Sequence, residues 1–184
     1  VVLPLLIAAA GIIFSIVGSF FVKIKNDQGN PQTALNIGNF TSVVLTAIAS
    51  YFIITGLLPK EVYIQNVLYS PTDVFITSVV GLVVGILVSL ITEYYTSMGR
   101  APVLSIIRQS GTGAATNIIA GLSVGFISTM LPTLVLVGGI IISFEVAGLY
   151  GVAMAASSMM ATTGMQLAID AFGPIADNAG GIAE

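Results

Sequence analysis

The run VFITSVVGLVVGILVSLIT, residues 74–92, carries no charged side chain between Asp73 and Glu93. An α-helix needs about 20 mainly apolar residues to cross the hydrocarbon core of a bilayer, and this run has that length. Its apolar residues do not alternate with polar ones, as the strands of a membrane β-barrel require. The run therefore predicts a membrane-spanning helix.

Four other stretches share this character, and turn-forming residues separate them, including a strong turn signal at Asn26–Pro31. In chain order, we expect spans at about 1–22, 34–58, 74–92, 113–143 and 149–177. The predicted fold class is all-α: a polytopic transmembrane helical bundle with five spans, forming a single partial transmembrane domain over residues 1–184.

The composition excludes several classes of protein. Of the 184 residues, five are Lys or Arg and eight are Asp or Glu, whereas 56% are hydrophobic. Too few polar groups are present to cover a surface in water, which excludes a soluble globular domain. Five cations make no basic stripe, so we expect no nucleic-acid partner. Because Cys and His are absent, thiolate chemistry, imidazole bases and zinc sites are excluded as well.

The distribution of cations predicts an orientation. The chain begins within an apolar run, and we interpret it as an internal piece of a larger membrane protein. With five spans, Lys23, Lys25, Arg100 and Arg108 fall on one side and Lys60 on the other. Cytoplasmic loops of membrane proteins are enriched in Lys and Arg. We therefore expect an integral, multi-pass protein whose C-terminal segment lies on the cytoplasmic side.

The fifth predicted span differs from the others because it is rich in Ala, Ser, Thr, Gly and Met. Such a composition suits a helix surrounded by other helices. Thr163, Gln166, Asp170 and Asp177 would share one face of a continuous helix. Carboxylates inside a membrane usually line a site or a water path. The alternative is that both acids mark the end of the helix, and Pro174 between them is able to break it.

The sequence DNAGG at residues 177–181 also has two interpretations. As a structural element it is a helix C-cap, in which Asn or Gly takes up the left-handed conformation. As a functional element it offers oxygen ligands from Asp177 and Asn178 to a hard cation such as Mg²⁺. The glycines would permit close approach of a ligand.

The wider segment GPIADNAGGIAE, residues 173–184, closely resembles the signature of membrane-bound, ion-translocating inorganic pyrophosphatases. Upstream, TEYYTS at 92–97, SGTGAATN at 110–117 and AIDA at 168–171 are similar to segments of the same family in the same order. The resemblance covers essentially the whole chain, which is similar to spans seven to eleven of the family's sixteen.

This resemblance implies part of a homodimeric pump that hydrolyses inorganic pyrophosphate with Mg²⁺ and couples hydrolysis to transport of H⁺ or Na⁺ across a lipid bilayer. K⁺ is a further candidate cofactor, as an activator. The first four spans would belong to an outer ring of helices, and the fifth to an inner ring that holds the site and the ion pathway.

The resemblance also implies roles for individual residues. Asp177 is expected to bind Mg-pyrophosphate as a metal ligand, and Asn178 is a weaker candidate for the same site. Asp170 lies one to two turns deeper, where a role in the coupling region and a structural hydrogen-bonding role are both open. No catalytic base is expected here, because most of the family's acids and lysines belong to other spans. We therefore expect residues 1–184 alone to lack hydrolytic activity.

Without the signature, the polar fifth span would favour another class, a helical bundle of a secondary transporter or channel whose pathway that span lines. No internal repeat of the kind common in such transporters is visible. Glu93, which follows the third predicted span, is interpreted as an ion-pair partner of Arg100 or Arg108 rather than as a substrate contact.

Overall fold

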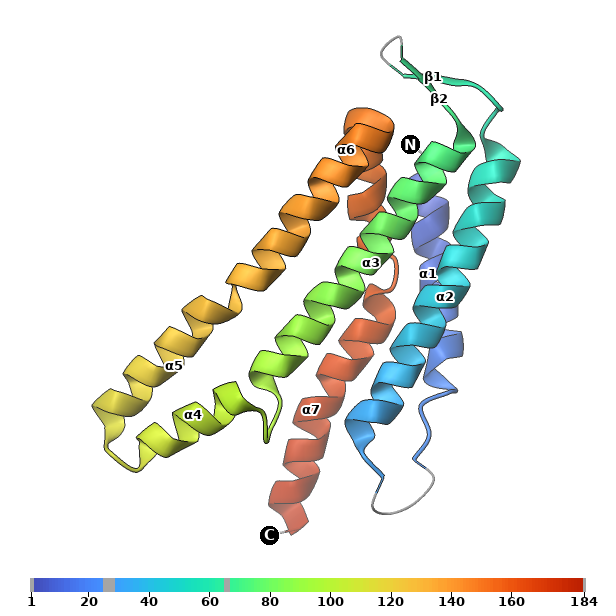
Figure 1. Ribbon diagram of the computed structural model, residues 1–184. Coiled ribbons are helices and arrows are strands. Elements are labelled where there is room, and N and C mark those ends of the chain that lie inside the picture. Colours follow the sequence, from blue (N-terminus) through green and yellow to red (C-terminus); the bar gives the residue numbers. More distant parts are fainter. Residues whose placement is uncertain (1, 25–28, 65–66, 184) are drawn as a thin grey trace.

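A computed structural model describes residues 2–24, 29–64 and 67–183. Within these ranges the chain is almost entirely helical (Figure 1). The helices are α1 (Val2–Ser19), α2 (Pro31–Leu57), α3 (Pro71–Thr96), α4 (Ala101–Ser110), α5 (Ala114–Ser128), α6 (Met130–Met159) and α7 (Thr163–Ala183). The strands β1 (Val62–Ile64) and β2 (Val67–Tyr69) pair in antiparallel register.

Four helical stretches of the described chain are long and apolar enough to cross a membrane: Val2–Ser19, Pro31–Leu57, Pro71–Ser110 and Ala114–Ala183. The last of these reverses direction within α6, where Ala147 and Gly148 leave helical geometry and Gly148 has a φ of 57°. The chain therefore runs along the bundle five times, in agreement with the predicted all-α polytopic class. A left-handed φ of this kind is accessible to glycine at little cost.

The sequence explains where two long helices start. Asn30 caps α2, because its side-chain oxygen accepts a hydrogen bond of 2.9 Å from the backbone N–H of Gln32. Ser70 caps α3 in a capping box with Asp73, whose carboxylate accepts the backbone N–H of Ser70 at 2.8 Å. A proline follows each cap at the first helical position, where its missing N–H costs nothing.

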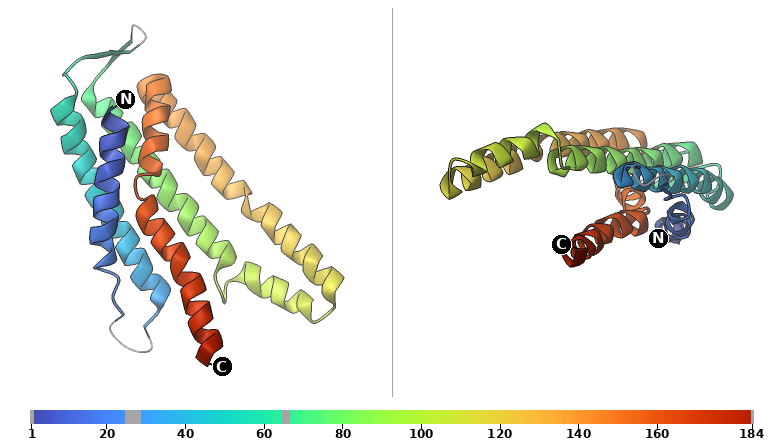
Figure 2. Two further views of the ribbon diagram at one scale, coloured as in Figure 1. Left: turned by 180° about the vertical axis from the view of Figure 1, so that it is seen from behind. Right: turned by 90° about the horizontal axis from the view of Figure 1, so that it is seen from below.

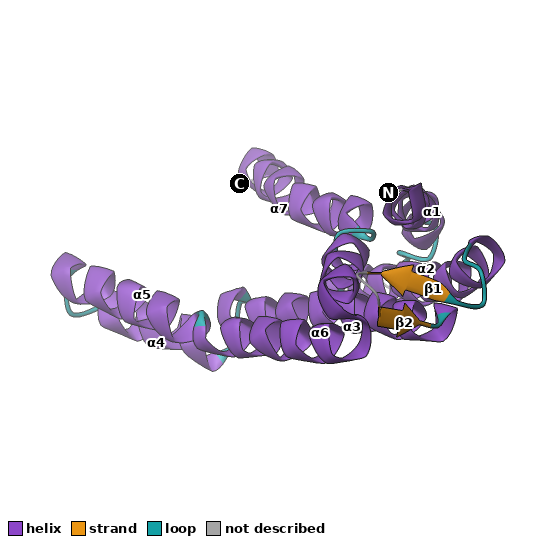
Figure 3. Ribbon diagram, turned by 90° about the horizontal axis from the view of Figure 1, so that it is seen from above, coloured by secondary structure: helices purple, strands orange, loops and turns teal. Residues whose placement is uncertain are grey.

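The helices form two layers (Figures 2 and 3). One layer contains α2, α3 and the first part of α6, and the other contains α1 and α7. In Figure 1 the chain ends marked N and C lie at opposite ends of the bundle, and α4 and α5 extend away from it beyond α3. The first half of the fifth pass, after Gly148, lies between the two layers.

Small residues bring α3 and α6 into close contact. A Cβ atom on Gly81 would overlap the carbonyl oxygen of Ala155, and one on Gly139 would lie 2.6 Å from a methyl of Val84. Beside this contact the hydroxyls of Ser78 and Ser158, both fully buried, are 2.7 Å apart and share a hydrogen bond. Helices in a membrane depend on such close packing for their association, because lipid tails are as apolar as the side chains and supply no hydrophobic driving force.

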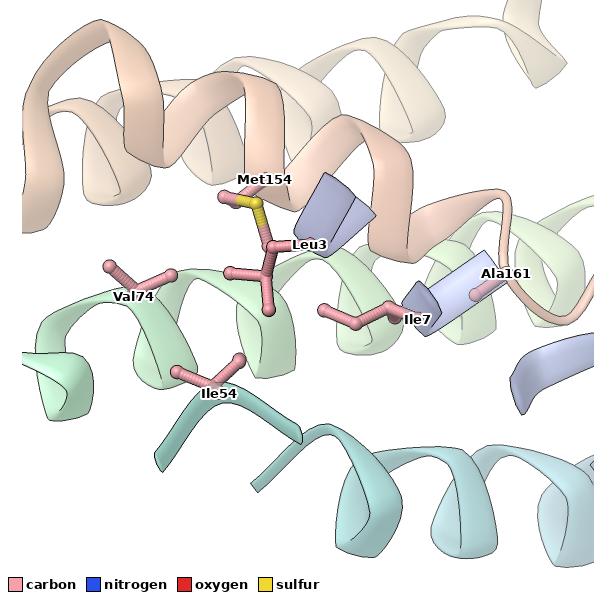
Figure 4. Packing of buried hydrophobic residues seen from close by; sticks show 6 residues of the cluster. All are labelled: Leu3, Ile7, Ile54, Val74, Met154 and Ala161. Carbon is pink, nitrogen blue, oxygen red and sulfur yellow. The ribbon is translucent and has the colours of Figure 1, made fainter. Parts of the chain in front are cut away.

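A compact apolar cluster joins both layers at the end of the bundle near the β-hairpin (Figure 4). It combines residues of α1, α2, α3 and α6 with one residue of the short link between α6 and α7: Leu3, Ile7, Ile54, Val74, Met154 and Ala161. By contrast, large apolar side chains of α5 and the first part of α6 point outward, and Ile118, Ile119 and Phe126 are all more than half exposed. Outward apolar faces are what a bilayer requires.

Several details differ from the expectations. The predicted fourth segment, 113–143, contains two helices separated at Thr129, and the predicted fifth, 149–177, contains the end of α6, a break at 160–162 and most of α7. Neither the helix α4 nor the β-hairpin was predicted within the connections. Helix α7 continues through Pro174 to Ala183 and is not broken there. The expected turn at Asn26–Pro31 and the cation Lys25 fall partly or wholly outside the described residues.

We predict that Gly81→Ala destabilises the purified protein in detergent by about 2 kcal/mol or more, because the added methyl meets backbone that cannot move away cheaply. The matched control is Gly121→Ala, since nothing lies within 4 Å of a Cβ at that position. Thermal unfolding followed by circular dichroism measures both. Equal midpoints for the two variants would contradict the packing described here.

Candidate functional site

The polar stripe predicted for the fifth span lies on α7. Thr163, Gln166, Asp170 and Asp177 all belong to this helix, and their spacing places them along one side of it. The stripe expected from the sequence is therefore present on a single helix. Its two carboxylates are seven residues apart, about 10 Å along the axis at 1.5 Å per residue.

Pro174 lies between the two acids and alters the backbone without ending the helix. Proline has no N–H to donate to the carbonyl four residues earlier, which here is that of Asp170. The Asp170 carbonyl is thus left without its usual helical hydrogen bond. Asp170 consequently offers two kinds of oxygen, a carboxylate and a free backbone carbonyl, at one level of the helix.

A cavity of about 480 Å³ lies between α2, α3 and the α6–α7 region, where α2 begins and α3 ends. It brings Asp170 and Gln166 of α7 opposite Glu93 of α3 and Asn36 of α2. The remaining lining is half polar and half apolar: Gln32, Ser89, Thr92, Thr96 and Ser97, and Gly85, Val88, Met159, Met160 and Ile169. This chamber is open on one side and has a mixed polar and apolar lining, with one carboxylate on α3 and one, which is exposed, on α7.

Glu93 is held in this chamber by an asparagine. The Nδ2 of Asn36 donates a hydrogen bond of 3.1 Å to the Oε2 of Glu93, and the Nε2 of Gln32 donates one of 3.4 Å to the Oδ1 of Asn36. The expected ion pair of Glu93 with Arg100 or Arg108 is not formed among the described residues; both arginines are exposed. Glu93 itself is half-buried.

Asp177 and Asn178 lie apart from the chamber. Both are exposed, as is every described residue of α7 after Asp170. In the described ranges, no group of three or more Asp, Glu, His or Cys residues is placed to hold a metal ion. One carboxylate with an adjacent amide oxygen does suit Mg²⁺, which commonly binds through one or two carboxylates, waters and substrate phosphates. The donors fit an edge of such a site, and further ligands are required to complete it.

The chamber adds Asn36 and Gln32 to the residues considered for function and places Glu93 beside them rather than beside an arginine. Sequence reasoning did not bring them together with Asp170, because Asn36 and Glu93 are 57 positions apart. The sequence held one weak signal for this pair: Asn36 and Glu93 each lie near the end of a predicted span, on the same predicted side of the membrane. Only the packing of α2 against α3 shows that these ends meet.

Comparison with known proteins gives a consistent result. Residues 1–184 match the family model described as inorganic H+ pyrophosphatase. A K(+)-insensitive pyrophosphate-energized proton pump of Methanosarcina mazei is 43% identical over 192 residues, covering all of this chain and 27% of that protein. A putative K(+)-stimulated pyrophosphate-energized sodium pump of Clostridium tetani is 39% identical over 192 residues, with the same coverage of both chains.

A shorter relative matches over most of its own length. Pyrophosphate-energized proton pump 2 of Mycoplana dimorpha is 43% identical over 185 residues, covering 98% of this chain and 88% of the relative. The chain thus spans about a quarter of the length of the longer relatives and most of this shorter one.

We predict that a small cationic thiol reagent reaches the chamber. The chain has no cysteine, so a single introduced thiol is the only target on it. Ser89→Cys, in the chamber lining, should react at least about tenfold faster than Ser158→Cys, which is buried at the α3–α6 contact, because access controls the reaction. Mass spectrometry of timed samples gives both rates, and equal rates would mean that the chamber is no more accessible to the reagent than the α3–α6 contact.

Proposed function

The chain belongs to the inorganic H+ pyrophosphatase family, and on that premise we propose that it forms part of a membrane pump that hydrolyses inorganic pyrophosphate and couples hydrolysis to transport of H⁺ or Na⁺. The observation that carries this proposal is the layout of α7. One helix bears an exposed acid, Asp177, and, seven residues earlier, a second acid, Asp170, that lines a chamber between helices.

Asp177 is proposed as a ligand of Mg²⁺ in the Mg-pyrophosphate complex, with Asn178 beside it as a weaker candidate. When bound, the metal neutralises phosphate charge and polarises the P–O bonds. The residues of this chain contribute anchoring: Asp177 fixes the complex to α7, and the amide of Asn178 can accept or donate one hydrogen bond. A single acid cannot assemble the whole centre, so other parts of the protein supply the remaining ligands and the base.

Asp170 is proposed to belong to the coupling region. It shares α7 with Asp177, so a displacement of the helix caused by binding at Asp177 reaches Asp170 through the backbone. Asp170 lines a chamber where a cation or a proton-carrying water finds oxygen ligands. The position therefore joins substrate binding to ion movement within one helix.

The proposed setting is a lipid bilayer, with the end of α7 that carries Asp177 on the cytoplasmic side. The excess of Lys and Arg at that end supports this orientation. A homodimer is proposed for the complete pump, and K⁺ as an activator remains a further proposal.

Replacement of the metal-binding acid is the direct test. In the complete pump, Asp177→Ala should abolish Mg²⁺-dependent phosphate release and pyrophosphate-driven ion uptake into vesicles, because the substrate complex loses an anchoring ligand. Glu145→Gln is the matched control, since this exposed acid lies near the reversal of α6 at the other end of the bundle. Retained hydrolysis in Asp177→Ala would refute the assigned role.

Asp170→Asn is the comparison variant in the same experiment. It should preserve Mg-pyrophosphate binding better than Asp177→Ala does and should reduce ion uptake more than hydrolysis. Equal loss of binding in both variants would count against separate roles. Ion transport that continues without pyrophosphate hydrolysis in the unaltered protein would favour a secondary transporter or channel instead.

Orientation is testable with introduced cysteines at the two ends of the bundle. In intact cells a membrane-impermeant maleimide should label Glu61→Cys, next to the β-hairpin, and should label Ile182→Cys only after permeabilisation. Both positions are exposed, so access to the membrane side decides the result. Labelling of Ile182→Cys in intact cells would reverse the proposed orientation.

A further inference from the structure

One side of α4 combines positive charge with apolar side chains. Four residues at successive spacings of four, three and one form this side, which we call the outer face of α4: Arg100, Leu104, Ile107 and Arg108. Such spacings place side chains along one side of a helix. All four residues are exposed, and Ile107 is exposed over 55% of its surface. The outer face therefore offers two cations and two apolar groups to whatever surrounds it.

The rest of α4 accounts for its packing against α5. Val103 and Ile106 are half-buried, and α4 lies alongside α5 (Figures 1 and 3). Helix α5 in turn exposes Ile118, Ile119 and Leu122 over more than half of their surface. The apolar surface of this region thus extends beyond the two residues of α4. Exposed apolar surface of this kind marks a contact with lipid or with protein.

The charge of the region favours a negatively charged partner. Between Glu93 and Glu145 the sequence contains no Asp or Glu, whereas Arg100 and Arg108 both lie in this stretch. A guanidinium group presents parallel N–H donors that match the oxygens of a phosphate group, and it stays charged at every physiological pH. Phosphate is therefore a group that both arginines can bind.

The position of α4 along the bundle indicates the headgroup layer of a membrane. Helix α3 has 26 residues, so it is about 39 Å long and exceeds the hydrocarbon core of about 30 Å. Its last turn carries Tyr94 and Tyr95, and tyrosines are enriched where a membrane meets water. Helix α4 begins at Ala101, shortly after α3 ends at Thr96. The start of α4 consequently lies at the level of lipid headgroups.

We propose that the outer face of α4 is a binding site for anionic phospholipid of the cytoplasmic leaflet. Arg100 and Arg108 bind headgroup phosphates, and Leu104 and Ile107 lie against the upper parts of the acyl chains, as an amphipathic helix does at a membrane surface. The bound lipid fixes α4 and α5 to the membrane surface. This site takes no part in pyrophosphate binding or ion transport, so the inference goes beyond the proposed function.

The experiment uses the complete pump, purified in an uncharged detergent and freed of lipid. Native mass spectrometry at increasing lipid concentration gives dissociation constants for phosphatidylglycerol and for phosphatidylcholine with the same acyl chains. We expect the unaltered protein to bind phosphatidylglycerol more tightly. Arg100→Gln combined with Arg108→Gln should weaken this binding at least about tenfold, because each arginine near an anionic surface contributes about fivefold in affinity.

Matched variants separate the contributions of charge and of apolar contact. Arg100→Lys combined with Arg108→Lys keeps both charges and should retain more phosphatidylglycerol binding than the glutamine pair. Lys60→Gln removes the same single charge as Arg108→Gln, but at the other end of the bundle, and should leave binding unchanged. Leu104→Ser combined with Ile107→Ser should weaken both lipids equally, since their acyl chains are the same.

Three results would overturn the proposal. The first is equal affinity of the unaltered protein for the two lipids, or unchanged phosphatidylglycerol binding in the glutamine pair. The second is displacement of the lipid by excess inorganic phosphate, which would indicate a site for free phosphate. The third is a lower thermal midpoint of the serine or glutamine pair in lipid-free detergent, which would show that another part of the pump covers this face. Because binding is measured without turnover, failure of the proposed function would leave the result intact.

Discussion

The contact of α3 with the second half of α6 determines where the functional helix begins. Gly81 allows the carbonyl of Ala155 to approach as close as backbone permits, and the hydroxyls of Ser78 and Ser158 pair beside it. Because this contact fixes residues 148–159 against α3, it fixes the point from which α7 starts. Lipid supplies no hydrophobic force between helices, so close packing of small residues carries the association.

The same contact divides the bundle into two ends with different chemistry. Toward the β-hairpin, the apolar cluster that includes Ile7, Ile54 and Met154 fills the space between the layers. Toward the other end the helices separate around the chamber, which contains Glu93 and Asp170. The two acids therefore lie at the end of the bundle away from the apolar cluster.

The long helices and the polar stripe on α7 could be predicted from the sequence, because both depend on residues close together in the chain. The charge-free run 74–92 predicted a helix that the structure extends to Pro71–Thr96, and the cap formed by Ser70 and Asp73 explains its start. The stripe from Thr163 to Asp177 was predicted from spacing alone, because both acids and Gln166 lie within one helix. Local features of this kind depend on neighbours in the chain.

The partnership of Asn36 with Glu93 was not predictable in the same way, because it depends on how two helices distant in sequence pack. The reversal at Gly148 lies inside a predicted connection, but the position of the fifth pass between two layers depends on tertiary contacts.

The alternative in which Pro174 breaks the helix is wrong, because α7 continues through this residue. A proline within a long helix removes one hydrogen bond and leaves the others in place. The missing bond makes α7 easier to bend between Asp170 and Pro174 than an unbroken helix, although the helix stays continuous from one acid to the other.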